Sequence, residues 1–423
     1  MRDYLKLHRQ SHVVDWHTHL SLKTAIFHRD LSKDYKRKIF GRSFWPLASR
    51  ADFPKMFDGG VNVSLSVCYI PELEWADDLP IIKILRWLRP SVWKSLFGAK
   101  TYFDASINAF DDVENQIKNF NLKSESQKVV FCRTPDALKN NTKSNNLCVV
   151  HAVEGAHSLQ GEYLEKYYNP TRTRQQGSAW SSSFAENELL GNLEHLHQRG
   201  CAYLTLAHFY PNYVANPVFP YPEYASKFAR WRKMLSSWNS CNGLSELGEV
   251  VVRRCFELGM IVDICHCTPI ARSRVYEIAD EMNSKCQVIA SHVGAYVKNP
   301  DQYNLEDWEI KWIANNGGLI SIILMNYWLV PHHTNLGLNE ISSVIQHIVD
   351  VGGIDCVSLG TDFDGFTDPP DEVEDMRNLP NITMRLASEM QGKGSFKYSD
   401  EDISKFLGEN SKRVLFEGWR NDY

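Results

Sequence analysis

The feature of this sequence that most limits its fold is a recurrence of short apolar runs, separated by longer polar or amphipathic stretches. Each run is about as long as a β-strand, and several are almost continuously apolar, as parallel strands buried on both faces tend to be. The chain contains eight of them: Val13–His19, Val61–Cys68, Leu147–Glu154, Cys201–His208, Met260–His266, Gln287–His292, Leu319–Leu324 and Cys356–Asp362.

The segments between the runs include helical patterns. Leu247–Leu258 and Ile341–Val351 carry apolar residues at helical spacing, and each is followed by a glycine, Gly259 and Gly352, which is a typical helix end. Eight strands alternating with helices predict an α/β fold, a (β/α)8 barrel of the TIM type. A doubly wound open sheet is the alternative, but no G-x-G-x-x-G phosphate turn follows the first run.

The chain is expected to form one domain, because residues 1–423 contain no low-complexity tract, charge run or break in composition that would mark a linker. A minimal barrel needs about 250 residues. The surplus falls into two insertions, about 71–146 after the second run and about 209–243 after the fourth. Both are rich in Trp, Tyr, Pro and Arg, so we expect ordered segments that cover the barrel or form a subunit contact.

Composition excludes several classes of protein. The net charge of −5 gives no sign of a nucleic-acid or anionic-membrane partner. The first residues lack the apolar region of a secretory signal, and no apolar stretch reaches the roughly 18 residues of a membrane span. The ten cysteines include no Cys-x-x-Cys pair. We therefore expect reduced thiols and a cytoplasmic location.

Polar side chains close six of the eight runs. Barrel enzymes place their chemistry at the carboxyl ends of the strands, so these side chains are expected to meet at one mouth. Each of them alone has an ordinary structural explanation, such as a hydrogen-bonded histidine or a turn carboxylate. Gathered together and buried, they would be costly without a cation to neutralise and satisfy them. They are His17, His19, Glu154, His208, His266, His292 and Asp362.

Imidazole and carboxylate ligands favour zinc or a similar divalent ion. Glu154 can bridge two ions through its two oxygens, with His17 and His19 on one ion and His266 and His292 on the other. Two ions about 3.5–4 Å apart form a hydrolytic site in which a bridging water loses a proton near neutral pH. The pattern thus predicts a binuclear metal centre.

These residues lie in motifs that resemble the membrane dipeptidase (renal dipeptidase-like) family of binuclear zinc peptidases, within the amidohydrolase superfamily. The resemblance runs from Val13 to about Phe416. Its most specific matches are VEGAHSL at Val153–Leu159, YLTLAH at Tyr203–His208, GLSELG at Gly243–Gly248, GMIVDICH at Gly259–His266, IASH at Ile289–His292 and GTDFDG at Gly360–Gly365.

The resemblance implies a metallo-dipeptidase-like hydrolase of a dipeptide or related small amide, with two divalent ions that we expect to be Zn²⁺. His17 and residue 19 would bind the first ion, His266 and His292 the second, and Glu154 both. A metal-bridging hydroxide would be the nucleophile. His208 would contact the substrate and stabilise the oxyanion, and Asp362 would pass the water's proton to the leaving amine.

The first departure from the family pattern is His19, where the family usually has an aspartate. A neutral ligand replaces an anionic one, which should lower the pKa of the bridging water and draw Asp362 toward the metal. We therefore expect Asp362 to coordinate the first ion.

The second departure is Tyr303, which stands where the family commonly has an arginine that grips the substrate's terminal carboxylate. A phenol at this substrate-binding position cannot make the charged bidentate contact. The sequence therefore predicts weak activity on ordinary dipeptides relative to a blocked or differently shaped amide.

Two other functions remain open at this point. The same activated water serves a lactone, an N-acyl amino acid or a cyclic amide. A metal-poor descendant could instead act as a binding protein, although such a protein would not need Glu154, His266, His292 and Asp362 together. The expected partner is a small-molecule or dipeptide-like substrate, with neither nucleic acid nor membrane, and the resemblance allows a homodimer.

Overall fold

A computed structural model provides the structure of the chain. It describes residues 2–35, 38–39, 42–43, 49–74, 98–144, 146–167, 183–220, 243–331, 337–365, 367–390 and 397–422.

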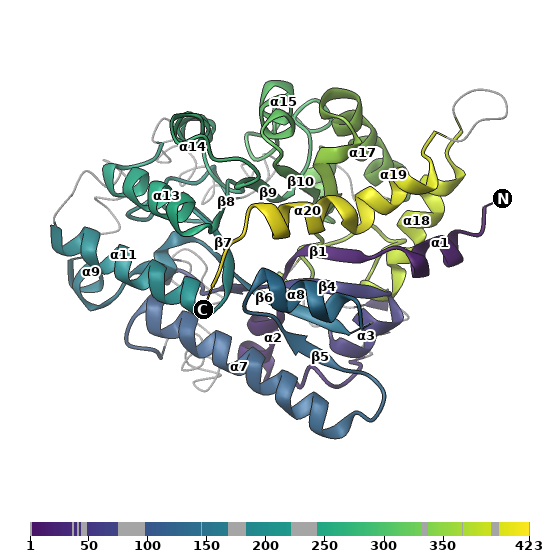
Figure 1. Cartoon of the computed structure of the whole chain (residues 1–423), viewed down its shortest axis with the longest axis horizontal. Helices are drawn as coiled ribbons and strands as arrows, with labels where there is room; N and C mark the ends of the chain where they lie inside the picture. The colour runs from purple at the N-terminus through teal and green to yellow at the C-terminus, as the bar shows by residue number, and fades with distance from the viewer. Residues whose placement is uncertain are drawn as a thin grey trace.

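Parallel strands close into a barrel, which confirms the predicted fold (Figure 1). Neighbours pair in the order β4, β1, β11, β10, β9, β8, β7 and β6, and a β4–β6 pairing completes the ring. Each of the eight predicted runs matches one of these strands, although β4 and β9 extend one residue past the end of their runs. The strands are β1 Val13–Thr18, β4 Val61–Tyr69, β6 Leu147–Glu154, β7 Cys201–Thr205, β8 Ile261–Asp263, β9 Val288–Val293, β10 Leu319–Ile322 and β11 Val357–Leu359.

The sequence missed three short strands. β5, Val129–Phe131, pairs with the first residues of β6 (Leu147 to Val149), whereas β7 pairs with β6 from His151 onward. Outside the barrel, β2 (Lys38–Ile39) and β3 (Arg42–Ser43) form an antiparallel pair. None of these three strands lies in an apolar run of six or more residues, whereas β8 and β11, which are also three residues long, lie in such runs.

Helices surround the barrel, and Figure 1 shows α13, α14, α15 and α17 outside the strands. The predicted helix end at Gly259 is confirmed, with a left-handed φ of 77°. α17 continues through Gly352 and ends at Gly353 (φ 87°), one residue later than predicted. The helices are α1 Tyr4–Gln10, α2 Leu20–Phe27, α3 Phe53–Asp58, α7 Tyr102–Lys123, α8 Pro135–Thr142, α9 Glu162–Tyr167, α11 Ser183–Gln198, α13 Glu246–Leu258, α14 Pro269–Glu281, α15 Asp307–Asn315, α16 Asn326–Leu329, α17 Leu338–Gly352, α18 Leu379–Ser388, α19 Asp400–Ser404 and α20 Asn410–Glu417.

Two buried clusters form the core. The larger one packs one face of the strands against the helices. The smaller one contains alternate residues of the other, inner face, such as Val63, Leu65 and Val67 of β4, together with Val414 and Leu415 of α20. Apolar side chains therefore fill the inside of the barrel, and polar groups occur at the carboxyl ends of the strands.

The predicted insertions are described only in part, because residues 75–97 and 221–242 lie outside the described residues. The described part of the first insertion contains α7, β5 and α8. Its role as a cover for the barrel or as a subunit contact stays a prediction. Over the described stretches, the structure has no helix that is long and apolar enough to span a membrane.

Candidate metal centre

Glu154, the last residue of β6, lies at the centre of the predicted polar group. Its Oε1 is 3.2–3.4 Å from the Nε2 atoms of His17, His266 and His292. Its Oε2 is 3.5 Å from His19 Nε2 and 3.7 Å from His208 Nε2. Five imidazoles from four strand ends, two of them from β1, therefore converge on one carboxylate that is 1% exposed.

Of three groups of potential ligand atoms among the described residues, two consist entirely of predicted residues, and the third, His17, Asp263 and His292, shares one histidine with each of them. His17, His19 and Asp362 form one, with 3.2 Å between the two Nε2 atoms and 3.0 Å from His19 Nε2 to Asp362 Oδ1. Glu154, His266 and His292 form the other, with 3.0 Å between the histidine Nε2 atoms. Asp362 thus lies beside the first pair of histidines.

Four of these side chains lie beyond the strands rather than in them. His19 follows β1, His208 and His266 each come three residues after the end of their strand, and Asp362 does so after β11. His266 (φ 62°) and Asp362 (φ 55°) adopt left-handed backbone conformations, which are costly for non-glycine residues and recur at functional sites. Regular strand alternation therefore does not set their directions.

Glycines next to the site allow close approach. A Cβ on Gly365 would lie 2.2 Å from Asp362 Oδ1 and 2.7 Å from the His19 ring. A Cβ on Gly155 would lie 2.3 Å from the His157 ring, and φ there is 89°. These contacts explain the glycines in two of the motifs, GTDFDG and VEGAHSL.

The turn that carries Asp362 is anchored by Asp364. This carboxylate is 2% exposed and accepts hydrogen bonds from the buried Lys23 ammonium (2.7 Å) and the Arg50 backbone N–H (2.9 Å). Lys23 and Arg50 hold the pKa of Asp364 below its usual value, against the effect of burial. Asp364 therefore has a structural role next to the candidate ligand Asp362.

Electrostatics keep the carboxylate charged and two of the imidazoles neutral. Burial alone would raise the pKa of Glu154, but the imidazoles, His208 and His17 first, hold it well below the ordinary range. Burial lowers the pKa of His17, and burial together with His17 lowers the pKa of His292 to about 4. An ionised carboxylate and neutral imidazoles are the forms that coordinate a metal ion.

The donor set fits divalent ions. Among the described residues, Glu154 Oε2 and His19 Nδ1 are buried without a hydrogen-bond partner. Two pairs of Nε2 atoms approach to 3.0–3.2 Å, where facing lone pairs repel unless a proton or a cation lies between them. Imidazole nitrogen with carboxylate oxygen, and no thiolate in the groups, is a zinc-type ligand set.

The sequence reasoning missed Glu72, which is buried beside His208. Its Oε1 is 3.3 Å from His208 Nδ1 and accepts the Phe209 N–H at 3.0 Å, and its Oε2 accepts the Tyr69 hydroxyl at 2.6 Å. Despite burial, the imidazoles of His208 and His157 lower the pKa of Glu72 to about 2. Glu72 lies in an aromatic insertion, and nothing in the local sequence indicates that it meets a strand-end histidine.

The structure places Tyr303 in an internal contact. The phenol is 1% exposed, stacks on Trp328, and donates its proton to the backbone carbonyl of His292 at 2.6 Å. A substrate contact through this hydroxyl would require that bond to break. Tyr303 therefore supports the end of β9. Its hydroxyl proton is already used in this bond and is not free to bind a substrate.

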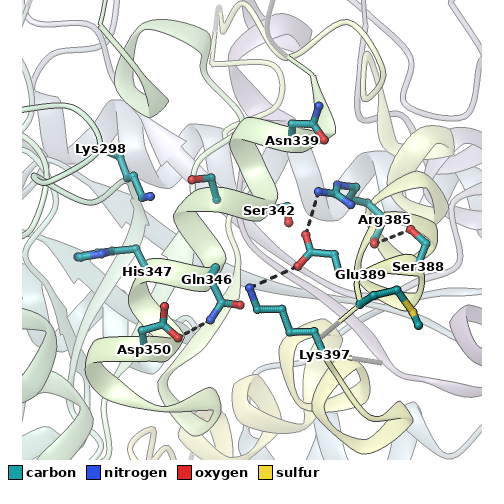
Figure 2. Close-up of a pocket in the computed structure, with 12 residues that line it drawn as sticks. Lys298, Asn339, Ser342, Gln346, His347, Asp350, Arg385, Ser388, Glu389 and Lys397 are labelled. Carbon is teal, nitrogen blue, oxygen red and sulfur yellow. Dashed lines mark hydrogen bonds and ion pairs between the residues drawn. The ribbon is translucent and has the colours of Figure 1, made fainter. Parts of the chain in front are cut away.

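A cavity of about 440 Å³ lies elsewhere, between α17 and α18. Figure 2 shows Glu389 between Arg385 and Lys397. Its Oε1 is 3.2 Å from the Arg385 guanidinium, and its Oε2 is 3.8 Å from Lys397 Nζ. None of the eight predicted site residues lines it. Since these lining charges are paired with one another, we assign the chemistry to the strand ends.

In the comparison with protein families, residues 178–419 match the membrane dipeptidase family (peptidase family M19). The matched segment contains His208, His266, His292 and Asp362. The matched segment does not include His17, His19 and Glu154, which precede it in the sequence and lie beside its residues only in the folded structure.

Among curated proteins, the chain is 30% identical to the dipeptidase tcpJ of Claviceps purpurea over 238 residues, which are 54% of this chain and 48% of that protein. It is 30% identical to the dipeptidase aclJ of Aspergillus oryzae over 179 residues, 41% of this chain and 38% of that protein. The chain thus spans about half or less of the curated relatives that it matches.

Among solved structures, a metallopeptidase from Rhodobacter sphaeroides, liganded with a phosphinate mimic of the dipeptide L-Ala-D-Ala, superposes with a TM-score of 0.68. The identity is 17%, with 97% of this chain and 99% of that chain covered. An amidohydrolase from Pseudomonas aeruginosa gives a TM-score of 0.61 at 15% identity, with 99% of both chains covered. At these identities the likeness shows a shared fold.

Proposed function

This chain belongs to the membrane dipeptidase family, peptidase family M19, and we propose that it is a metal-dependent hydrolase of dipeptides or related small amides. The observation that carries the proposal is the convergence of five imidazoles on the buried Glu154 carboxylate. We propose two ions, most simply Zn²⁺. His17, His19 and Asp362 would hold the first, His266 and His292 the second, and Glu154 would be shared.

Such a pair of ions would lower the pKa of the attacking water toward neutral pH and would polarise the scissile carbonyl. In this proposal the Asp362 carboxylate takes the water's proton and delivers it to the leaving amine. Its side chain is 13% exposed, so it lies at the open side of the site, where proton exchange is easiest.

His208 is proposed to stabilise the oxyanion. With Nδ1 held by Glu72, its Nε2 faces the site, 3.7 Å from Glu154 Oε2. Burial lowers the pKa of His208, and the carboxylates of Glu154 and Glu72 oppose that shift. Glu72 therefore favours the protonated imidazole, which can donate a hydrogen bond from Nε2 to the developing negative charge.

Metal analysis and a substrate panel test the proposal. Protein purified without chelator should contain about two equivalents of divalent metal, as a binuclear site requires. Chelation should abolish hydrolysis of at least one dipeptide, and added zinc should restore it. The panel should include L-Ala-L-Ala, L-Ala-D-Ala, their C-terminal amides, an N-acyl amino acid and a lactone.

The outcomes separate the alternatives. Turnover of the amidated compounds above the free dipeptides would agree with an altered carboxylate-binding position at Tyr303. Turnover of the lactone alone would contradict amide hydrolysis. Much less than two equivalents of metal would contradict the binuclear centre, and absence of both metal and turnover would indicate a binding protein.

Replacing Glu72 tests the proposed role of His208. Glu72→Gln keeps a hydrogen-bond acceptor but removes the charge that favours the imidazolium, so kcat should fall by roughly 10²-fold with metal content unchanged. Steady-state kinetics and metal analysis measure both. Glu114→Gln is the matched control, because Glu114 also lies beside a buried histidine, His151, at 3.6 Å. An unchanged kcat in Glu72→Gln would remove Glu72 from the mechanism.

A further inference from the structure

The hydroxyl of Ser291 lies behind both halves of the candidate metal centre. Ser291 is on β9, fully buried, and immediately precedes His292. Its Oγ is 2.8 Å from His292 Nδ1, 3.1 Å from His17 Nδ1 and 2.7 Å from Asp263 Oδ2. One small side chain thus contacts an imidazole from each of the two ligand groups. The ring centroids of these imidazoles, His17 and His292, are 3.7 Å apart.

The hydrogen bonds around Asp263 fix the direction of the Ser291 proton. Asp263 is fully buried, and its Oδ1 accepts the backbone N–H groups of Ser291 (2.9 Å) and Cys265 (3.2 Å). Its Oδ2 accepts the hydroxyl of Thr205 at 2.6 Å, and the Ser291 hydroxyl donates to the same oxygen. Asp263 is therefore the acceptor in this network.

The direction of that proton determines the state of two histidines. A serine hydroxyl has one proton and two lone pairs. Because its proton goes to Asp263, its lone pairs can only accept, so the Nδ1 atoms of His17 and His292 must both be donors. Their Nε2 atoms then carry lone pairs, and these face Glu154 Oε1 at 3.4 and 3.3 Å.

His17 has a second acceptor, whereas His292 depends on Ser291 in the contacts that the structure describes. The hydroxyl of Tyr203 donates to the Trp16 carbonyl at 2.8 Å, and its oxygen lies 3.0 Å from His17 Nδ1. The two imidazoles should therefore respond differently when the serine hydroxyl is removed.

We propose that Ser291, oriented by Asp263, is a shared positioning residue that sets the tautomer and the aim of one histidine in each half of the metal centre. The inference rests on the proposed function, since it assigns the Nε2 atoms to metal ions. His17, Asp263 and His292 also lie close enough together to suggest a third ion site. The Ser291 Oγ is hydrogen-bonded to all three, so it occupies the space that such an ion would need.

The first test uses Ser291→Ala with Ser321→Ala as the control. Ser321 is a fully buried serine on the neighbouring strand β10, and its hydroxyl bonds to Ser358 at 2.7 Å, so the control removes a similar buried hydroxyl. The zinc affinity of each variant is measured by competition with increasing concentrations of a chelator. In Ser291→Ala, the affinity for the ion held by His292 should fall about 10–100-fold, and the affinity for the ion held by His17 should fall less. Adding Tyr203→Phe should extend the large loss to both ions.

The second test includes a measurement on the wild type alone, which does not depend on the folding of any variant. Long-range ¹H–¹⁵N spectra of metal-free wild-type protein should show His17 and His292 as Nδ1–H tautomers, and in Ser291→Ala the His292 signal should change more than the His17 signal. An Nε2–H tautomer of either histidine in the wild type would overturn the proposal. So would wild-type zinc retention in Ser291→Ala, or an equal loss in Ser321→Ala.

The two proposals fail in distinguishable ways. Wild-type protein that binds fewer than two ions contradicts the binuclear function whatever Ser291 does. Wild-type protein that binds two ions, together with a Ser291→Ala variant that keeps both, contradicts only the role of Ser291.

Discussion

Glu154→Gln is expected to abolish binding of both metal ions and to lower turnover by roughly 10³-fold or more, because the activated water is lost with the ions. The neutral amide keeps the size of the side chain but removes the charge on which five imidazoles converge. An amide also has a nitrogen in place of one of the two oxygens that would bridge the ions.

Two measurements separate this effect from unfolding. Zinc should raise the Tm of the wild type, since a ligand that binds only the folded state stabilises it, and this increase should vanish in Glu154→Gln. The Tm of the metal-free variant should stay close to that of the metal-free wild type. Glu114→Gln should keep both its ions and its zinc-dependent increase. Two tightly held ions in Glu154→Gln would refute the assignment of Glu154 as the shared ligand.

Arg272→Met is expected to give the largest loss of stability, about 3–5 kcal/mol, because it leaves a buried carboxylate without its partner. Arg272 of α14 is 2% exposed and Glu309 of α15 is 1% exposed. The guanidinium makes two bonds to that carboxylate, at 2.7 and 2.9 Å. It also donates to the carbonyls of Cys267 and Gln302, at 2.9 and 2.8 Å, and so ties the segment after β8 to the loop after β9.

The same helix supplies the control. Arg274 pairs with Glu249 at 2.7 and 2.9 Å but is partly exposed, so Arg274→Met should cost less than about 1 kcal/mol. Adding Glu309→Leu to Arg272→Met should recover much of the loss, since no unpaired charge then remains. Denaturant unfolding of the metal-free proteins measures all three. Equal losses in the two single arginine variants would contradict the argument.

The strands of the barrel were predictable because parallel strands buried on both faces are continuously apolar over a strand's length. Leu147–Glu154, which coincides with β6, is close to this pattern, whereas Val61–Cys68 alternates apolar residues with Asn and Ser and covers β4 except for its last residue, Tyr69. β5 was not predictable, because Val129–Phe131 does not lie in a longer apolar run of the kind that contains the equally short β8 and β11. The end of α17 shifted by one residue because Gly353, not Gly352, has the positive φ that ends the helix.

The candidate ligands were predictable as a set, because polar residues that close apolar runs are rare enough to stand out. The exact strand ends were not, since His266 and Asp362 reach the site through left-handed residues beyond their strands. Tyr303 shows the limit of reasoning from a motif. The sequence indicated which residue stands at that position, but only the fold shows its hydroxyl bonded to the carbonyl of His292.

By itself, the sequence determined the barrel class and the identity of the residues at its mouth, because hydrophobic periodicity and strand-end chemistry are local properties of the chain. The tertiary structure decided what those residues contact. Glu72 meets His208 across 136 positions, and Ser291 meets His17 across 274. Such pairings depend on how the strands close into a ring, and no local pattern encodes that closure.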